Sequence, residues 1–204
     1  MQLYAIIGAA GTGALIIMEQ DTLYLSFSEI PDASEILFKG EIPGIFVEEA
    51  IRSHSFSMVT RHFHESLELY FLIEGERFYF VEQDTYHLQE HMAILVDQNQ
   101  IHKTCPAGTG KKHHRFLMQL EGPVLDQLLR LCGSVSLEEF GNAYRGITRF
   151  SVDQWAQILS LLTQIKEQFT LISSRTTPGN KQDTMTANGL IRLYTCLLYT
   201  SDAA

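Results

Sequence analysis

Between residues 45 and 120 the sequence holds a closely spaced series of short runs rich in β-branched and aromatic residues. Short polar turns separate the runs, so no room remains for the helices that would have to connect parallel strands. The expected strands are residues 45–47, 55–64, 67–73, 77–81, 86–88, 92–96 and 115–120. This spacing predicts a mostly antiparallel sheet that closes into a barrel or a double-sheet jelly roll.

After residue 120 the apolar residues take the spacing of helices. Pro123 suits the first turn of a helix that would end near Gly133. A longer helix is expected from Ser151, because Ser151 and Gln154 match the capping-box pattern. Residues 173–186 are polar and are expected to form a linker. The chain is therefore expected to be mainly β, with C-terminal helices that make it α+β overall.

The second helix carries an apolar seam with the 3-4-3-4-3 spacing of a coiled coil. Its residues are Trp155, Ile158, Leu162, Ile165, Phe169 and Ile172. The first five are predicted to carry dimerisation. Because the seam is shorter than three heptads, packing against the chain's own barrel is the alternative.

The charge of the chain argues against direct binding to nucleic acid. The 204 residues have a formal net charge of −9 and no large cluster of Lys and Arg. The longest basic run, residues 111–115, is expected to be a solvated loop. Three cysteines without a CxxC pair fit a reducing cytoplasm.

The first 17 residues are apolar, but they contain neither Lys nor Arg, so they lack the charged start of a signal peptide. They are also too short and too rich in glycine for a membrane span. Met18 is one candidate for the natural start, and an N-terminal arm that includes these residues is the alternative. No membrane partner is expected.

The most informative motif is His-x-His-x3-Glu-x6-Gly, formed by His62, His64, Glu68 and Gly75. On a strand, His62 and His64 would point to the same side, and a turn near residues 65–66 would bring Glu68 beside them. His102, after a later strand and loop, is a fourth candidate. These four side chains indicate either a metal site for Fe, Mn, Ni or Zn or a polar binding site for a small molecule.

These residues carry a resemblance to a known family. The motif resembles the first cupin motif, and His102 stands in the place of the second. The wider pattern RHFHESLELYFLIEGERFYFVEQDTYHLQEHMAILVDQNQIHKT is similar to the N-terminal sensor and dimerisation domain of AraC-type transcription regulators. The resemblance implies a cupin barrel that binds a small effector, often a sugar, helices that form a homodimer, and a C-terminal helix-turn-helix domain that binds DNA.

The sequence departs from the family pattern at several positions. The family's Gly-Asp turn is replaced by Glu90-His91, which puts the tightness of that turn in doubt. Pro106 replaces the Asn that closes the second motif in cupin enzymes, which weakens the interpretation as an enzyme. No helix-turn-helix pattern is present, so DNA would be a partner only through a domain missing from this sequence.

The resulting expectation has four parts along the chain. Residues 1–43 are expected to form an N-terminal arm, residues 44–121 the sensor barrel, and residues 122–195 the helical dimerisation region and linker. Residues 196–204, CLLYTSDAA, match the translation of a sequencing-transposon end and are interpreted as an adaptor artefact. We expect a non-enzymatic sensor fragment of a regulator that acts in the cytoplasm.

Two alternatives remain open for the barrel. No cofactor is expected of a sensor, whereas a metal-dependent cupin enzyme, either a dioxygenase or a sugar isomerase, would hold a divalent metal at His62, His64, Glu68 and His102. A structural barrel that only dimerises is the second alternative. The same four residues are predicted to bind the effector in a sensor.

Overall fold

The computed structural model describes residues 14–19, 22–27, 34–53, 56–58, 60–110, 112–131, 138–139, 145–174, 189 and 191. The chain divides into two compact units, Met1–Ala33 and Ser34–Ala204. In the first unit, β1 (Ala14–Glu19) and β2 (Thr22–Phe27) form an antiparallel hairpin.

The second unit contains two antiparallel sheets. Its elements are β3 (Glu35–Ile42), β4 (Ile45–Ser53), β5 (Leu67–Glu74), β6 (Arg77–Val81), β7 (Asp84–Leu88), β8 (Met92–Val96), β9 (His102–Pro106), β10 (Lys112–Leu120), α1 (Gly122–Leu131), β11 (Gly146–Arg149) and α3 (Val152–Ser174). The large sheet has the strand order β11-β8-β5-β10-β4-β3, and the small sheet has the order β7-β6-β9. The expected helix after Pro123 corresponds to α1, and the one after Ser151 to α3.

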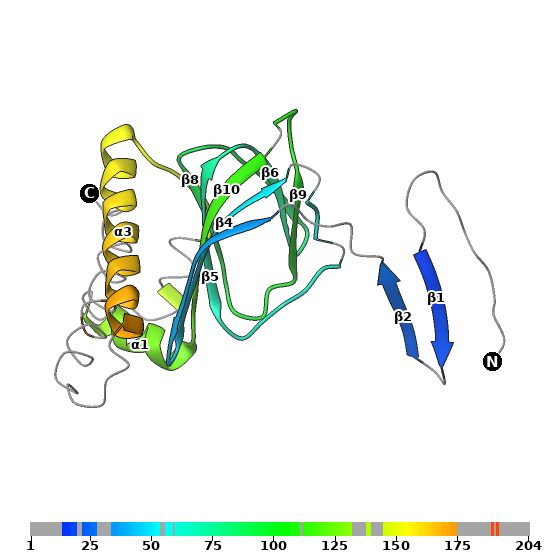
Figure 1. Cartoon of the computed structure of the whole chain (residues 1–204), viewed down its shortest axis with the longest axis horizontal. Coiled ribbons are helices and arrows are strands. Elements are labelled where there is room, and N and C mark those ends of the chain that lie inside the picture. Colours follow the sequence, from blue (N-terminus) through cyan, green and yellow to red (C-terminus); the bar gives the residue numbers. More distant parts are fainter. Residues whose placement is uncertain are drawn as a thin grey trace. The chain divides into compact units, whose positions relative to one another are not determined.

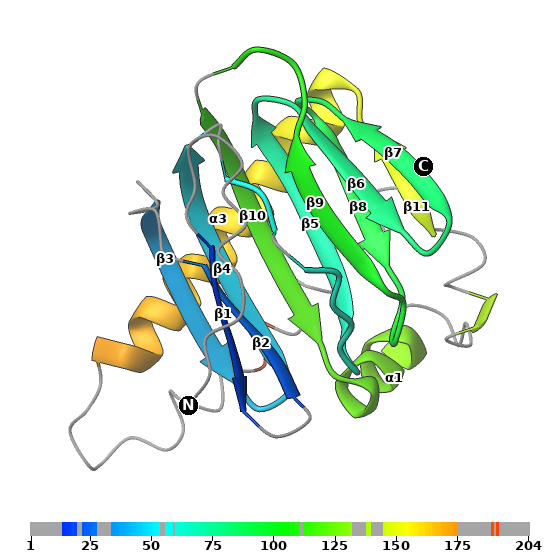
Figure 2. The ribbon, with the colours of Figure 1, turned by 90° about the vertical axis from the view of Figure 1, so that its right-hand side faces the viewer.

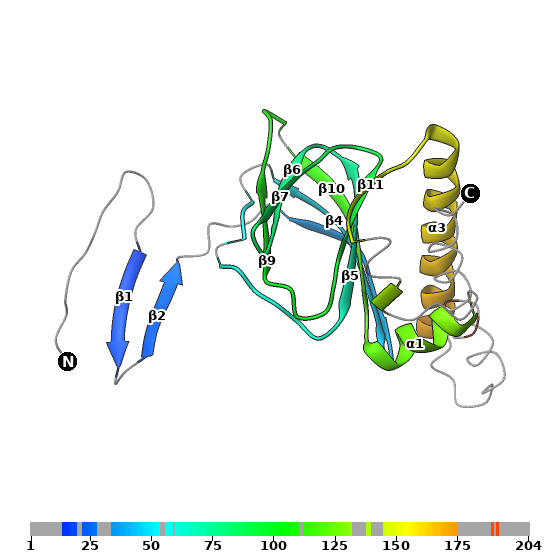
Figure 3. The ribbon, with the colours of Figure 1, turned by 180° about the vertical axis from the view of Figure 1, so that it is seen from behind.

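Figures 1 and 3 show the large sheet between the small sheet and the helices α1 and α3. In Figure 2 the long helix α3 crosses behind the strands of the large sheet. The facing sheets and the C-terminal helices confirm the expected mainly β, jelly-roll architecture, α+β overall. Within the described residues, no helix is both long and apolar enough to cross a membrane.

The large sheet buries apolar side chains on both of its faces. On β5, Leu69 and Phe71 point toward the helices, whereas Tyr70 and Leu72 belong to a second cluster between the sheets. We call the space between the two sheets the barrel interior. The alternation along each central strand thus separates a largely apolar core under the helices from a mixed interior between the sheets.

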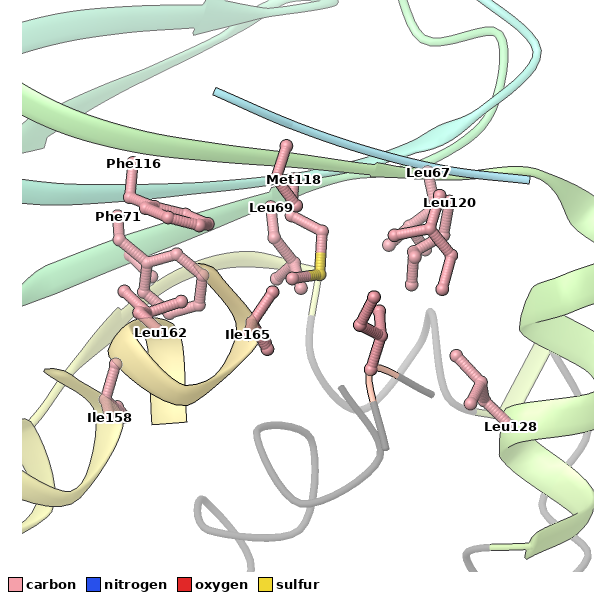
Figure 4. Close-up of a cluster of buried hydrophobic side chains, with 14 of the residues drawn as sticks. Leu67, Leu69, Phe71, Phe116, Met118, Leu120, Leu128, Ile158, Leu162 and Ile165 are labelled. Carbon is pink, nitrogen blue, oxygen red and sulfur yellow. The ribbon is translucent and has the colours of Figure 1, made fainter. Parts of the chain in front are cut away.

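The apolar seam of α3 packs on the large sheet (Figure 4). Buried members of this core include Leu67, Leu69 and Phe71 from β5, Phe116, Met118 and Leu120 from β10, Leu128 from α1, and Trp155, Ile158, Leu162, Ile165 and Phe169 from α3. Burying one large apolar side chain stabilises a fold by about 1.5–3 kcal/mol. Burial within one chain favours the alternative, packing against the chain's own barrel, over the predicted dimer surface for the five seam residues.

The N-terminus of α3 has the predicted capping box. Gln154 donates its backbone N–H to the Ser151 hydroxyl at 3.2 Å, and Ser151 donates its backbone N–H to Gln154 Oε1 at 2.9 Å. Polar contacts also connect α3 to the sheet, since Lys166 Nζ donates to Glu49 of β4 at 2.5 Å. The start and the orientation of α3 are therefore set by local sequence and by the sheet beneath it.

The expected strand at residues 55–64 is wrong. β4 ends at Ser53, and the described residues from 56 to 66 form no regular strand. Their backbone pairs with β9 only at intervals, through Met58 N to Thr104 O at 3.1 Å and an isolated bridge between His62 and His102. The segment leaves the large sheet and runs along the small one, so it cannot continue a single ladder.

The expected solvated loop at residues 111–115 is also wrong in its described part. Lys112 to Arg115 open β10, and the side chains of His113 and Arg115 are buried. Lys112 keeps an exposed ion pair with Glu74 at 3.2 Å. Because side chains alternate along a strand, every second side chain of this basic run points toward the inside of the protein.

The turn at Glu90-His91 forms without the family's glycine. His91 adopts a left-handed backbone with φ of 61°, a conformation that non-glycine residues rarely take. Its ring stacks on Trp155 with centroids 5.3 Å apart, and its carbonyl accepts from the Phe150 backbone N–H at 3.0 Å. Contacts to the start of α3 thus hold this turn in place of a glycine.

Candidate ligand-binding site inside the barrel

The irregular segment before β5 brings two histidines to the start of β9. His62 exchanges backbone hydrogen bonds with His102, His62 N to His102 O at 3.0 Å and His102 N to His62 O at 2.8 Å. The two imidazole centroids lie 4.2 Å apart, and the His64 ring lies 5.0 Å from that of His102. The backbone bridge therefore gathers three imidazoles that are up to 40 positions apart in the chain.

Glu68 on β5 lies beside these rings and is buried. Its carboxylate is 3.1 Å from His64 Nε2 and 3.7 Å from His102 Nε2. The Tyr79 hydroxyl donates to its Oε1, and Gln119 Nε2 donates to its Oε2 at 3.3 Å. The structure thus places Glu68 next to His64 and His102, as the sequence motif predicts.

Backbone carbonyls fix the orientation of two imidazoles. His64 Nδ1 lies 2.8 Å from the Ser66 carbonyl oxygen, and His102 Nδ1 lies 2.8 Å from the Gln100 carbonyl oxygen. A carbonyl only accepts, so both Nδ1 atoms carry hydrogen and both Nε2 atoms face Glu68. A neutral Nε2 would oppose its lone pair to the carboxylate. A cation, either a proton or a metal ion, therefore belongs between these rings and Glu68.

The electrostatics of the cluster agree with this assignment. Burial alone would raise the pKa of Glu68, but the nearby imidazole of His102 and hydrogen bonds from His64 and Tyr79 outweigh it and hold the pKa far below its ordinary value. The hydrogen bond to Glu68 raises the pKa of His64 above 6.5. Burial, together with the neighbouring His102, lowers the pKa of His62. His64 is consequently the proton carrier that the arrangement favours.

The three imidazoles also fit the donor set of a divalent metal. One ligand nitrogen from each of His62, His64 and His102 lies within 4.8 Å of the others. The Nδ1–H groups that hold His64 and His102 on carbonyls are the outer contacts typical of metal-binding histidines. Glu68 contacts two of the three rings, so it is placed to balance the charge of an ion held by them.

Sequence reasoning missed two partners of the cluster, Tyr79 on β6 and Gln119 on β10. Both belong to runs in which every second residue faces the barrel interior, and that alternation is the signal that could have found them. Among the other histidines, His87 forms an exposed pair with Glu76 at 2.9 Å. It lies outside the cluster.

Comparison with known protein families finds one match for this chain. Residues 43–202 match the family described as AraC-like ligand binding domain. No curated protein matches the sequence.

Several solved structures are similar at low identity. A cupin superfamily protein from Desulfitobacterium hafniense DCB-2 is 15% identical, with 46% of this chain and 80% of that chain covered and a TM-score of 0.38. An RmlC-like cupin family protein with a double-stranded β-helix fold from Methanocaldococcus jannaschii is 14% identical, with 57% and 95% covered and a TM-score of 0.39.

A putative mannose-6-phosphate isomerase from Ralstonia eutropha JMP134 is 13% identical, with 47% of this chain and 89% of that chain covered and a TM-score of 0.39. These structural similarities are weak, and the family assignment rests on the match over residues 43–202. That match spans well over half of the sequence, and the chain therefore belongs to the family of AraC-like ligand-binding domains.

Proposed function

We propose that this chain is the effector-sensing, dimerising part of an AraC-type DNA-binding transcription regulator that acts in the cytoplasm. DNA recognition is assigned to a further domain that this sequence does not contain. The observation that carries the proposal is the buried polar cluster around Glu68, inside the barrel of a chain that belongs to a ligand-binding family. Burying polar groups in this way costs free energy unless each has a hydrogen-bond partner. A ligand-binding function would explain why they are kept.

The effector is a small polar molecule, and His62, His64, Glu68 and His102 line its site. Hydroxyl groups suit this lining, because Glu68 accepts hydrogen bonds and the neutral imidazole of His62 has one nitrogen that donates and one that accepts. A sugar-like molecule is therefore the first class to test. Homodimerisation stays part of the proposal, but it requires a surface other than the buried seam of α3.

A thermal-unfolding screen of the purified chain against sugars and related metabolites tests effector sensing. An effector that binds the folded state raises the unfolding temperature in a concentration-dependent way. His64→Ala should abolish this rise, whereas the control His87→Ala, at the exposed histidine paired with Glu76, should keep it. Specific, salt-sensitive DNA binding by this chain alone would contradict the assignment of DNA recognition to another domain.

The second candidate function is a metal-dependent cupin enzyme, a dioxygenase or sugar isomerase. It is favoured by the convergent nitrogens of His62, His64 and His102. A divalent metal there would act as a Lewis acid and would lower the pKa of a bound water. Elemental analysis of purified protein separates the two functions. Stoichiometric metal that is lost in His62→Ala and His102→Ala, but kept in His87→Ala, would favour the enzyme.

A further inference from the structure

Three arginines contribute a second polar cluster to the same barrel interior. Arg52 lies near the end of β4, Arg77 at the start of β6, and Arg115 near the start of β10. On β9 the histidine cluster occupies the first residue, His102, whereas Arg77 pairs with the last, Pro106. The arginines therefore lie toward the opposite ends of the strands that carry the histidine cluster.

The register of the strands directs these side chains into the interior. On β10, Arg115 pairs with Leu72 of β5, which faces the interior, while the next residue, Phe116, faces the helices. On β6, Arg77 has the same parity as Tyr79, another member of the interior cluster. Both guanidinium groups therefore enter the space between the two sheets.

Hydrogen-bond donors remain unused in this cluster. Arg77 is fully buried and donates from Nε to Thr104 Oγ1 at 3.1 Å and from Nη1 to the Phe56 carbonyl at 2.9 Å, but its Nη2 has no partner. Arg115 donates from Nη2 to Glu48, and its buried Nη1 has no partner. The Tyr70 hydroxyl is buried and without a partner as well. Each unmade bond costs free energy in a buried site.

Arg77 has no carboxylate partner among the described residues, unlike Arg115 and Arg52. Glu48 Oε1 accepts from both Arg115 and Arg52, the second at 3.4 Å. Within the described part of the chain, no carboxylate bonds to Arg77, whose pKa is lowered by burial. Glu48 thus serves Arg115 and Arg52, whereas Arg77 lacks a carboxylate partner among the described residues, and a buried cation without a counter-charge is strongly unfavourable.

Tyr70 connects the arginines to the histidine cluster. Its ring lies 5.9 Å from the Arg115 guanidinium carbon and packs edge-on against Tyr79, with centroids 5.2 Å apart. Burial raises the pKa of Tyr70, while the charges of Arg115 and Arg77 act in the opposite direction, as expected for neighbouring cations. Tyr79 in turn donates to Glu68. A single small molecule in the interior would meet both clusters.

We propose that Arg77, Arg115 and Tyr70 form an anion-binding subsite that receives the carboxylate or phosphate group of a small hydroxylated effector. The oxyanion accepts hydrogen bonds from Arg77 Nη2, Arg115 Nη1 and the Tyr70 hydroxyl, and it neutralises the charge of Arg77. The hydroxylated part of the molecule lies toward Glu68. This inference rests on the proposed effector-sensing function and names the chemical class of the effector.

Matched pairs of ligands test the subsite with the full 204-residue chain. Galacturonate is compared with galactose, and glucose 6-phosphate with glucose, by isothermal titration at equal ionic strength. Because charge-assisted hydrogen bonds are the strong ones, the anion of at least one pair should bind about tenfold tighter than its neutral partner, or more. The pair that responds distinguishes a carboxylate effector from a phosphorylated one.

Tyr70→Phe is the sharpest variant, because it removes a hydroxyl that has no partner and so should leave the fold intact. It should weaken binding of the anion by about fivefold or more, and Arg77→Lys should weaken it further, because Lys lacks the planar fork of Arg. Tyr86→Phe is the matched control. The Tyr86 hydroxyl lies near Gly146 of β11, and its removal should leave binding unchanged.

Equal binding of the neutral and anionic members of each pair would overturn the anion subsite and would leave effector sensing intact. Unchanged anion affinity in both Tyr70→Phe and Arg77→Lys would also overturn it. Failure of all four ligands, and of inorganic phosphate and sulfate, to bind would overturn the subsite for both anion classes. Effector sensing would then be judged by the broader screen of neutral compounds.

Discussion

Glu68 is the residue on which the histidine cluster depends. Four side chains from separate segments surround its buried carboxylate: His64, Tyr79, His102 and Gln119. Such a carboxylate stays ionised only while its donors remain in place. The geometry of the cluster is therefore tied to the stability of the fold.

Removal of one donor tests this dependence. Tyr79→Phe should lower the free energy of unfolding by about 1–3 kcal/mol, because it leaves a buried charged acceptor with one hydrogen bond fewer. Urea unfolding measures the change. Tyr86→Phe, at a partly buried tyrosine of the neighbouring strand, should have little effect. Equal losses of unfolding free energy in the two variants would show that the hydrogen bond from Tyr79 to Glu68 does not stabilise the fold.

The pairing of His64 with Glu68 predicts a dependence of stability on pH in metal-free protein. The raised pKa of His64 means that its contribution is complete below its ordinary pKa of 6.5 and is lost as pH rises through the folded pKa. The lowered pKa of Glu68 means that its contribution is complete above 4.5 and is lost as pH falls through the folded pKa.

Urea unfolding of wild type and Glu68→Gln across this range provides the measurement. The advantage of the wild type should be largest between about pH 4.5 and 6.5 and should shrink at higher pH. A histidine NMR titration should place the pKa of His64 above 6.5 and that of His62 below it. An advantage that grows above pH 6.5 would contradict the assignment of the proton to His64.

The sequence predicted part of the cluster and missed the rest for a physical reason. Histidines and a carboxylate at strand spacing are rare enough to stand out, so His64, Glu68 and His102 could be recognised. Arg115 could not, because a charged residue in a strand is ordinarily assigned to the solvent-facing side. In this protein polar residues also face inward, and only the tertiary structure shows it.

The helix α3 is the element whose sequence pattern and tertiary contacts differ most. Its 3-4-3-4-3 seam predicts a partner surface, and the partner is the chain's own sheet. A short seam has the same spacing in both cases, so the sequence alone leaves the choice open. The start of α3, by contrast, was predictable because capping depends on neighbouring residues alone.

A truncation in the seam distinguishes the two partners. Ile165→Ala should cost about 2–5 kcal/mol of unfolding free energy, independent of protein concentration, because the side chain is buried within one chain. Leu171→Ala on the exposed side of α3 is the control and should change stability by about 0.5 kcal/mol or less. Denaturant unfolding at two protein concentrations checks both. A loss of unfolding free energy in Ile165→Ala that depends on protein concentration would indicate that the seam contacts a second chain.

The edge strand β3 was missed because it need not show a hydrophobic alternation. Most of its residues are at least partly exposed, and it pairs with β4 along one side. Central strands such as β5 and β8 were predicted well, since burial on both faces requires nearly continuous apolar or aromatic sequence. Burial, more than local propensity, decided which strands the sequence revealed.

At the scale of the whole second unit, the large sheet separates two environments. One face packs an apolar core under α1 and α3, and the other face contributes to an interior that also contains buried carboxylates, imidazoles and guanidinium groups. An apolar core on the first face supplies stability. Burying the charged groups on the second face costs free energy. A ligand-binding interior needs such polar groups to orient its ligand.

Methyl NMR of the chain during titration with a ligand from the screen tests this central claim most directly. We expect shifts at Leu72, Ile94 and Leu117, whose side chains lie in or against the cluster between the sheets. The methyl groups of Ile158 and Leu162, on the helix side of the same sheet, should stay in place. Shifts confined to the helix side or to exposed methyl groups would contradict a ligand site inside the barrel.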